Sequence, residues 1–91
     1  MEFKKEGNRF FSEDSDGNLL AEITYFPKGD DRIVIDHTFV DPSLRGQGIA
    51  EQSVDYVVKE MKTENKKIEP LCPYVVELFA RKPEKYGEIS V

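Results

Sequence analysis

Apolar and polar residues alternate along three segments in the first half of the chain. The weakest alternation covers residues 3–12 and is broken by Gly7-Asn8, a pair typical of a tight turn or hairpin. Stronger alternations cover Leu19–Phe26 and Arg32–Val40. Because successive side chains of a strand point to opposite faces, these segments predict strands with one buried face. Turn-forming residues separate them, at 14–18 and 27–31.

In the second half of the chain the period changes from two residues to that of a helix. Val54, Val57, Val58 and Met61 are spaced three and four apart, which places them on one face of a helix over roughly residues 47–64. Asn65 is expected to end this helix. We expect a short strand to follow at 66–71.

Cys72-Pro73 then predicts the start of a second, short helix that continues to about Ala80. Proline is tolerated at the first position of a helix, so Cys72 is expected to be the N-cap. The residues around Pro83 predict only a turn. Three strands, a helix, a strand and a short helix together predict an α+β (α/β-like) fold in which helices are layered on a sheet.

Strict alternation would assign the side chains of Arg32–Val40 to two faces. One face would carry Ile33, Ile35, His37 and Phe39, and the other Val34, Asp36, Thr38 and Val40. This assignment holds only if no β-bulge interrupts the strand, since one extra residue reverses the faces beyond it.

Length and composition are those of one small globular domain, which we expect to span residues 1–91. Of the 91 residues, 38% are hydrophobic and 34% are charged, which argues against a disordered chain. We find no apolar run long enough for a membrane span and no apolar segment of a signal peptide after Met1. The single cysteine excludes an intramolecular disulfide, so we expect a cytoplasmic protein. One cysteine and one histidine are too few for an ordinary structural zinc site, and no metal is expected.

The formal net charge is −5, which argues against nucleic acid as a partner because such proteins usually carry a basic stripe. An acidic surface could attract a cationic amine. The simpler interpretation is that the charge keeps a small protein in solution.

Residues 40–50, Val-Asp-Pro-Ser-Leu-Arg-Gly-Gln-Gly-Ile-Ala, connect the third predicted strand to the long helix. The first amides of a helix have no acceptor within it, and the helix dipole gives them partial positive charge. Glycines let the backbone approach a bulky anion, so the segment suits a phosphate group. It lacks the spacing Gly-x-Gly-x-x-Gly and has no lysine after Gly48. On the residues alone, an ordinary turn that needs glycine for its geometry explains it equally well.

The same segment resembles the acyl-CoA pyrophosphate loop of the GNAT superfamily of N-acetyltransferases, Gln/Arg-x-x-Gly-x-Gly/Ala. Arg45, Gly48 and Ala50 fill the three defined positions. The chain is similar, more narrowly, to a short, single-domain group of that superfamily, which pairs a His-Thr-x-Val strand with a later Cys-Pro-Tyr. Here these are residues 37–40 and 72–74, and the resemblance covers roughly residues 18–90.

The resemblance implies a minimal GNAT fold: a mostly antiparallel sheet with a splayed strand pair, one long helix and one short helix, and a bulge in the strand before the loop. It implies acetyl-CoA as cofactor, with pantetheine lying between the splayed strands and the pyrophosphate on the loop. The cofactor-binding residues it implies are Thr38, Phe39, Val40, Arg45, Gly46, Gln47, Gly48, Ile49, Ala50 and Pro73.

The catalytic candidates are Cys72, His37 and Tyr74. A cysteine at a helix N-terminus is a candidate for an acyl carrier, and a histidine for a proton relay. Tyr74 lies in the region where many GNAT enzymes place the tyrosine that protonates the departing CoA sulfur. Each also has a structural explanation, as a buried thiol, a core imidazole or a packing phenol. Glu22 and Asp36 are possible general bases and Tyr86 is a possible proton donor, but no pattern distinguishes them from other residues of their kind.

The chain departs from the superfamily where acceptor substrates bind, because it has no room for the two helices between the first strands. An open site could admit a small-molecule amine or a protein lysine. It could also be completed by a partner or by a second subunit, or catalysis could be lost. The alternatives to an N-acetyltransferase are therefore a non-catalytic acyl-CoA-binding module and a plain interaction domain.

Overall fold

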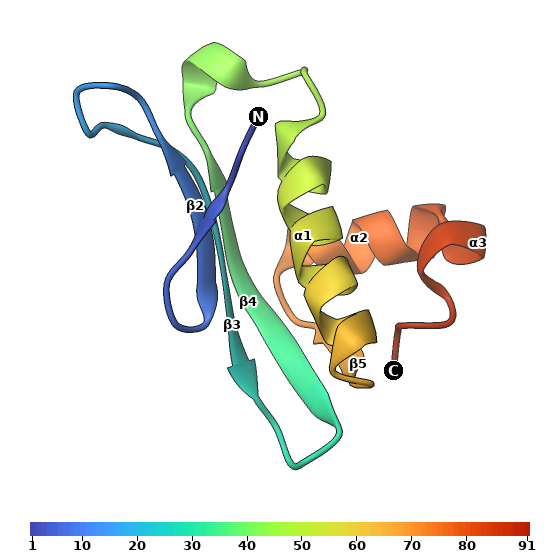
Figure 1. The fold of residues 1–91 in the computed structure, drawn as a ribbon. Helices are drawn as coiled ribbons and strands as arrows, with labels where there is room; N and C mark the ends of the chain where they lie inside the picture. The colour runs from blue at the N-terminus through green and yellow to red at the C-terminus, as the bar shows by residue number, and fades with distance from the viewer.

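The alternating segments form a five-stranded sheet in the computed structural model, which describes residues 1–91. Strands follow the order β1-β2-β3-β4-β5, with antiparallel pairing up to β4 and a parallel pairing of β5 with β4. Helices α1, α2 and α3 lie together on one side of the sheet (Figure 1). The bounds are β1 Lys4–Lys5, β2 Arg9–Glu13, β3 Leu19–Pro27, β4 Arg32–Val40, η1 Pro42–Leu44, α1 Ile49–Thr63, β5 Lys67–Pro70, α2 Pro73–Arg81 and α3 Pro83–Tyr86.

These elements confirm the predicted α+β fold with a mostly antiparallel sheet. The long helix begins at Ile49 and ends at Thr63, inside the predicted bounds. Asn65, at φ 58°, breaks it with a left-handed residue. Two short elements went unpredicted: the 3₁₀ helix η1, and α3, where only a turn was expected.

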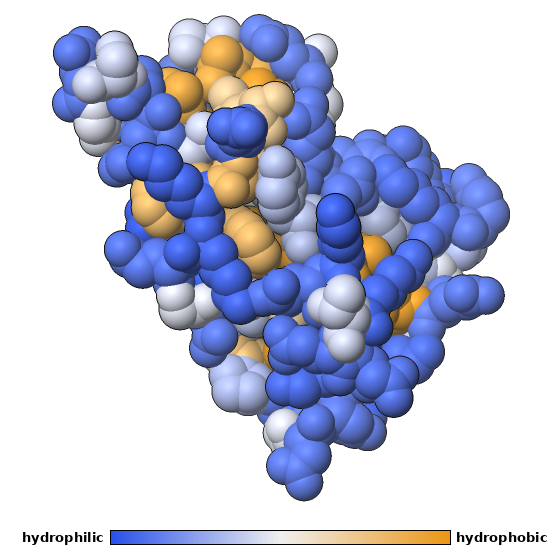
Figure 2. Space-filling view, in the orientation of Figure 1, coloured by the Kyte–Doolittle hydropathy of each residue, from blue (hydrophilic) through white to orange (hydrophobic).

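The core lies between the sheet and the helices as one cluster of 15 buried residues. The valine stripe of α1 is buried in it, as its spacing predicts, together with Met61. Each such side chain contributes roughly 1.5–3 kcal/mol through removal of apolar surface from water. No helix of the structure combines the length and the hydropathy that crossing a bilayer requires. On the face shown in Figure 2, hydrophilic residues dominate and apolar ones come to the surface only in small patches.

β4 contains the bulge that the resemblance implied, so strict alternation does not hold along this strand. Thr24 pairs with His37, whereas the next residue, Tyr25, pairs with Ile35, so Asp36 is the extra residue. Beyond the bulge the faces are reversed. Thr38 and Val40 therefore share the helix side with Ile33 and Ile35, while the opposite face carries Val34, His37 and Phe39.

Charged side chains cover that opposite face, over which no helix lies. Val34 is only 2% exposed although it is outside the core cluster. Its neighbour in register on β5 is Glu69, whose carboxylate pairs with both Lys28 and Arg32. The aliphatic parts of these long side chains can shield apolar surface while their charges stay in water.

Tyr86 links α3 to α1 through hydrogen bonds of its hydroxyl. Tyr86 is 1% exposed, and its hydroxyl shares one proton between Asp55 Oδ1 at 2.7 Å and Glu51 Oε2 at 3.1 Å. Lys82 and Lys85 also bind the Glu51 carboxylate, at 3.0 and 2.7 Å. Hydrogen bonds, first of all that from Lys85, hold the pKa of Glu51 at about 2, against an ordinary value of 4.5.

This lowered pKa predicts a loss of stability in acid. A carboxyl group whose pKa is lower in the folded state stabilises the fold above its unfolded pKa. The contribution should be complete above about pH 4.5 and should disappear as pH falls towards about 2. Urea unfolding across this range should show that Glu51→Gln loses about 1–2 kcal/mol near neutral pH and flattens the acid dependence.

The control is Glu77→Gln, which removes a carboxylate that pairs only with Arg81, one turn along α2. Such an exposed pair contributes little, so its unfolding curves should follow those of the wild type. An acid dependence as steep in Glu51→Gln as in the wild type would contradict this account.

Candidate functional site

The parallel strands β4 and β5 separate after Ile35. Their register runs only from Arg32 to Ile35 on β4. The Ile35 carbonyl accepts hydrogen bonds from both Leu71 N, at 3.0 Å, and Cys72 N, at 3.1 Å. Since β5 ends at Pro70 and α2 begins at Pro73, no strand pairs with β4 on this side beyond the bulge. The splayed strand pair implied by the resemblance is therefore present.

The second half of β4 presents backbone groups to this gap. Asp41 N donates to Leu20 O at 2.8 Å, so Leu20 and Asp41 form a hydrogen-bonded pair of the β3–β4 ladder. Hydrogen-bonded and non-hydrogen-bonded pairs alternate in an antiparallel ladder. The N–H and C=O groups of Thr38 and Val40 consequently point into the gap. Phe39, which was predicted with them, directs its backbone groups to β3 instead.

The loop after β4 leaves a row of amides without acceptors. Asp41 caps η1 by accepting from Ser43 N at 3.0 Å, and the chain then turns through Gly46 at φ 82° and Gly48 at φ 75°. Left-handed φ values favour glycine, which explains both residues. Counting from the start of α1, the first amide that donates to a carbonyl of the helix or its N-cap is Gln52 N, which bonds Gly48 O. No hydrogen bond is formed by the N–H groups of Gly46, Gln47, Gly48, Ile49 and Ala50.

A hollow of about 190 Å³ joins this loop to the gap. Tyr74 of α2 closes it from the far side, and Leu44, which the sequence did not single out, adds an apolar wall. Its lining is Val40, Leu44, Arg45, Gly46, Gly48, Ile49, Ala50 and Tyr74. Six of these eight are predicted cofactor-binding residues and one is a predicted catalytic residue, so the fold gathers them at one place.

The charges around the hollow favour an anion. Arg45 is exposed and forms no salt bridge. Glu51, in the first turn of α1, would repel an anion at this helix N-terminus, but Lys82 and Lys85 bind its carboxylate and offset its charge. Unbonded amides, the helix dipole and Arg45 then act in the same direction.

Cys72 and Tyr74 border the gap from the start of α2. Cys72 is the N-cap, as predicted, and its half-buried Sγ lies 3.5 Å from Thr38 Oγ1 across the gap. Pro73 is the exposed first residue of the helix. Burial raises the pKa of Tyr74, and the Glu51 charge raises it further, so the phenol keeps its proton at neutral pH.

His37 lies on the opposite face of the sheet from Cys72. The bulge directs it to the uncovered face, whereas Cys72 packs against the core on the helix side. The fold therefore does not bring these two candidates into contact. No group of three or more metal-ligating side chains is arranged to hold a metal ion.

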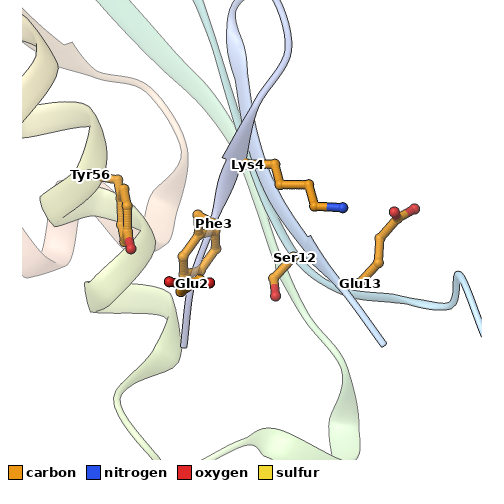
Figure 3. A pocket seen from close by; sticks show the side chains of 6 residues that line it. All are labelled: Glu2, Phe3, Lys4, Ser12, Glu13 and Tyr56. Carbon is orange, nitrogen blue, oxygen red and sulfur yellow. The ribbon is translucent and has the colours of Figure 1, made fainter. Parts of the chain in front are cut away.

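The largest hollow is elsewhere, at the β1 edge of the sheet. It measures about 550 Å³ and is lined by Glu2, Phe3, Lys4, Ser12, Glu13 and Tyr56. Figure 3 shows Phe3 and Tyr56 facing each other there, with Lys4 and Glu13 on the other side of β1. We place the candidate site at the smaller hollow, because only there do unbonded backbone donors converge.

The comparisons with known proteins agree with this geometry. Residues 9–89 match the model of a family described as GCN5-related N-acetyl-transferase. A Staphylococcus aureus structure, described as a GCN5-like candidate N-acetyltransferase, is similar at 33% identity, with a TM-score of 0.82. The alignment covers 99% of this chain and 87% of that one. No curated protein matches the sequence significantly.

Two more distant structures share the fold. A Mycobacterium tuberculosis protein solved in complex with CoA and NLQ is 23% identical, with a TM-score of 0.68. The alignment covers 84% of this chain but 47% of that one. A ribosomal-protein-alanine N-acetyltransferase from Brucella melitensis is 24% identical, with a TM-score of 0.58, over 91% of this chain and 62% of that one.

We predict that Gly48→Ala weakens binding of coenzyme A without unfolding the protein. An added Cβ at Gly48 meets no atom within 4 Å, so the cost is the strain of a left-handed φ, about 1 kcal/mol. Relief of that strain would turn the loop amides, and the dissociation constant measured by calorimetry should rise about fivefold or more.

Gly17→Ala is the matched control. Gly17 has φ 85° and equally open surroundings, but it lies in the turn between β2 and β3. It should lose similar stability and keep the affinity of the wild type. Equal affinities in the two variants would count against the loop as the anion site.

Proposed function

Because this chain belongs to the GCN5-related N-acetyltransferase family, which uses acetyl-CoA, we propose that it acetylates the nitrogen of an amine. The observation that carries the proposal is the row of unbonded amides from Gly46 to Ala50 beside the β4–β5 gap. The acceptor that we propose is a primary amine, on a small molecule or on a protein. The uncovered sheet face leaves room for either, or for a partner or second subunit that completes the site. We place the protein in the cytoplasm.

The loop would hold the diphosphate of CoA. Backbone donors at a helix start suit a diphosphate because they are oriented before binding and because the helix dipole attracts anions. Arg45 would add a charge-assisted contact. The 23%-identical mycobacterial structure, whose description names CoA, shares the fold over 84% of this chain and is consistent with the assignment.

The gap would hold the amide-rich pantetheine arm. Thr38 and Val40 present N–H and C=O groups at the spacing of a strand edge, and a peptide-like ligand can pair with such an edge. One of these N–H groups is suited to donate to the thioester carbonyl oxygen as negative charge develops there. Pro73 would limit the gap on the side of α2.

In the proposed reaction, the amine nitrogen attacks the acetyl carbonyl carbon, a C–N bond forms, and the C–S bond breaks. Tyr74 donates its hydroxyl proton to the departing sulfur and recovers a proton from the acetylated nitrogen. Its place on the hollow supports this role, and a tyrosine hydroxyl carries its proton at neutral pH. His37 would accept the proton that the ammonium form of the acceptor must lose first.

Cys72 offers a variant mechanism. Its sulfur lies across the gap from Thr38, where the thioester would lie, and could accept the acetyl group before the amine does. A non-catalytic acyl-CoA module would keep the loop and the gap but acetylate no amine. These alternatives differ in whether an acetyl group stays on Cys72 and in whether an amine is acetylated.

Tyr74→Phe tests the proton donor. We expect kcat for acetylation, measured over a panel of small and peptide amines, to fall on the order of tenfold to a hundredfold while coenzyme A still binds. Tyr56→Phe is the matched control, because this tyrosine lines the hollow at the β1 edge and not the one beside the loop. It should change stability by no more than about 0.5 kcal/mol and keep its kcat.

Mass spectrometry after incubation with acetyl-CoA separates the mechanisms. Direct attack predicts retained ligand under native conditions and no acetyl adduct after denaturation. An adduct that Cys72→Ala abolishes would establish the acyl-enzyme instead. Retained ligand with no acetylated amine in the panel would support the non-catalytic module, and a full kcat in Tyr74→Phe would refute the role of Tyr74.

A further inference from the structure

His37 and Glu22 lie together on the uncovered face of the sheet. The bulge at Asp36 moves His37 to this face, directly across from Thr24 and two register pairs from Glu22, which lies across from Phe39. Its Nε2 lies 3.5 Å from Glu22 Oε1. The imidazole is 52% exposed, so a solute can reach it, whereas Glu22 is only 19% exposed.

Glu22 is fixed by contacts on its other side. Its second oxygen, Oε2, forms a close ion pair with Arg9 Nε. The guanidinium of Arg9 lies over the ring of Phe11, 3.9 Å from the ring centroid. One carboxylate oxygen is therefore anchored, and the other is held towards His37. Such an arrangement is pre-organised to orient an imidazole.

The pair also lies beside the gap. The residue after His37 is Thr38, whose backbone groups face the gap and whose hydroxyl contacts Cys72. Cys72 and Tyr74 line the gap from the helix side, while His37 stands on the opposite face. An acceptor that approached from the uncovered face would therefore meet the imidazole before it met the acetyl group.

We propose that Glu22 is a positioning residue that orients His37 as the general base, an inference that rests on the proposed acetyl transfer. His37 Nε2 lies 3.5 Å from Glu22 Oε1 without a hydrogen bond in this structure, and we propose that the two close to hydrogen-bond distance when the acceptor binds. Glu22 would then accept from Nε2–H of the imidazole, which leaves the lone pair of Nδ1 facing the acceptor. Nδ1 takes one proton from the acceptor ammonium, the freed nitrogen attacks the thioester, and the sulfur takes the proton of Tyr74. The acceptor is thus a protonated amine at the uncovered face.

Glu22→Ala tests the proposal, and Glu69→Ala is its matched control. Glu69 is a carboxylate on the same face that also pairs with basic side chains, Lys28 and Arg32, but is remote from His37. In the wild type, ¹⁵N chemical shifts of the imidazole should report mainly the Nε2–H tautomer. Glu22→Ala should shift the tautomer equilibrium towards a mixture, and Glu69→Ala should leave it unchanged.

Kinetics supply the second readout. Glu22→Ala should lower kcat about tenfold, leave the affinity for coenzyme A unchanged, and have no further effect in a His37→Ala background. The proposal is overturned if Glu22→Ala and Glu69→Ala lower kcat equally, or if the two effects add in the double variant. An unchanged tautomer in Glu22→Ala overturns it even if no amine is acetylated, so its failure is separate from that of the proposed function.

Discussion

The separation of β4 and β5 at Ile35 is the constraint on which the rest of the site depends. The Ile35 carbonyl accepts hydrogen bonds from Leu71 N and Cys72 N. These are the last backbone hydrogen bonds on this side of β4 before the gap opens. Because β5 then gives way to α2, β4 continues for five residues with one edge unpaired. The N–H and C=O groups of this open edge are available to pair with a peptide-like ligand. The loop after β4 extends the same row of donors onto the start of α1.

The uncovered sheet face shows how a chain of 91 residues does without helices on both sides. Core residues gather on the helix side, while the other face is shielded by charged side chains, such as Arg9 over Phe11 and the Lys28–Glu69–Arg32 cluster beside Val34. The face thereby avoids a large exposed apolar area and still leaves His37 accessible. On the same face, the ion pair with Arg9 holds Glu22 beside the His37 imidazole.

Sequence patterns predicted most of the fold, because alternation and the valine spacing of α1 report burial directly. The turn after β4 was predictable because the positive φ values of Gly46 and Gly48 favour glycine, but its role as an anion site was expected only from the resemblance. The bulge was likewise expected only from the resemblance, and alternation alone could not show which face His37 occupies. The sequence also could not show whether the amide of Phe39 faces β3 or the gap. That direction depends on which β4 residues form hydrogen-bonded pairs with β3, and this pairing joins residues far apart in the sequence. The Glu51–Lys82–Lys85 cluster joins helices that are distant in sequence, and no local pattern marks it.

Amide hydrogen exchange along β4 tests the central claim, that the gap and the loop form one acetyl-CoA site. In the free protein, the amides of Thr38 and Val40 should exchange quickly and that of Phe39 slowly, because only Phe39 is bonded to β3. Saturating acetyl-CoA should slow Thr38, Val40 and the loop amides from Gly46 to Ala50 together, and leave Phe39 as it was. Protection of Thr38 and Val40 before ligand is added, or no change after it, would contradict the account.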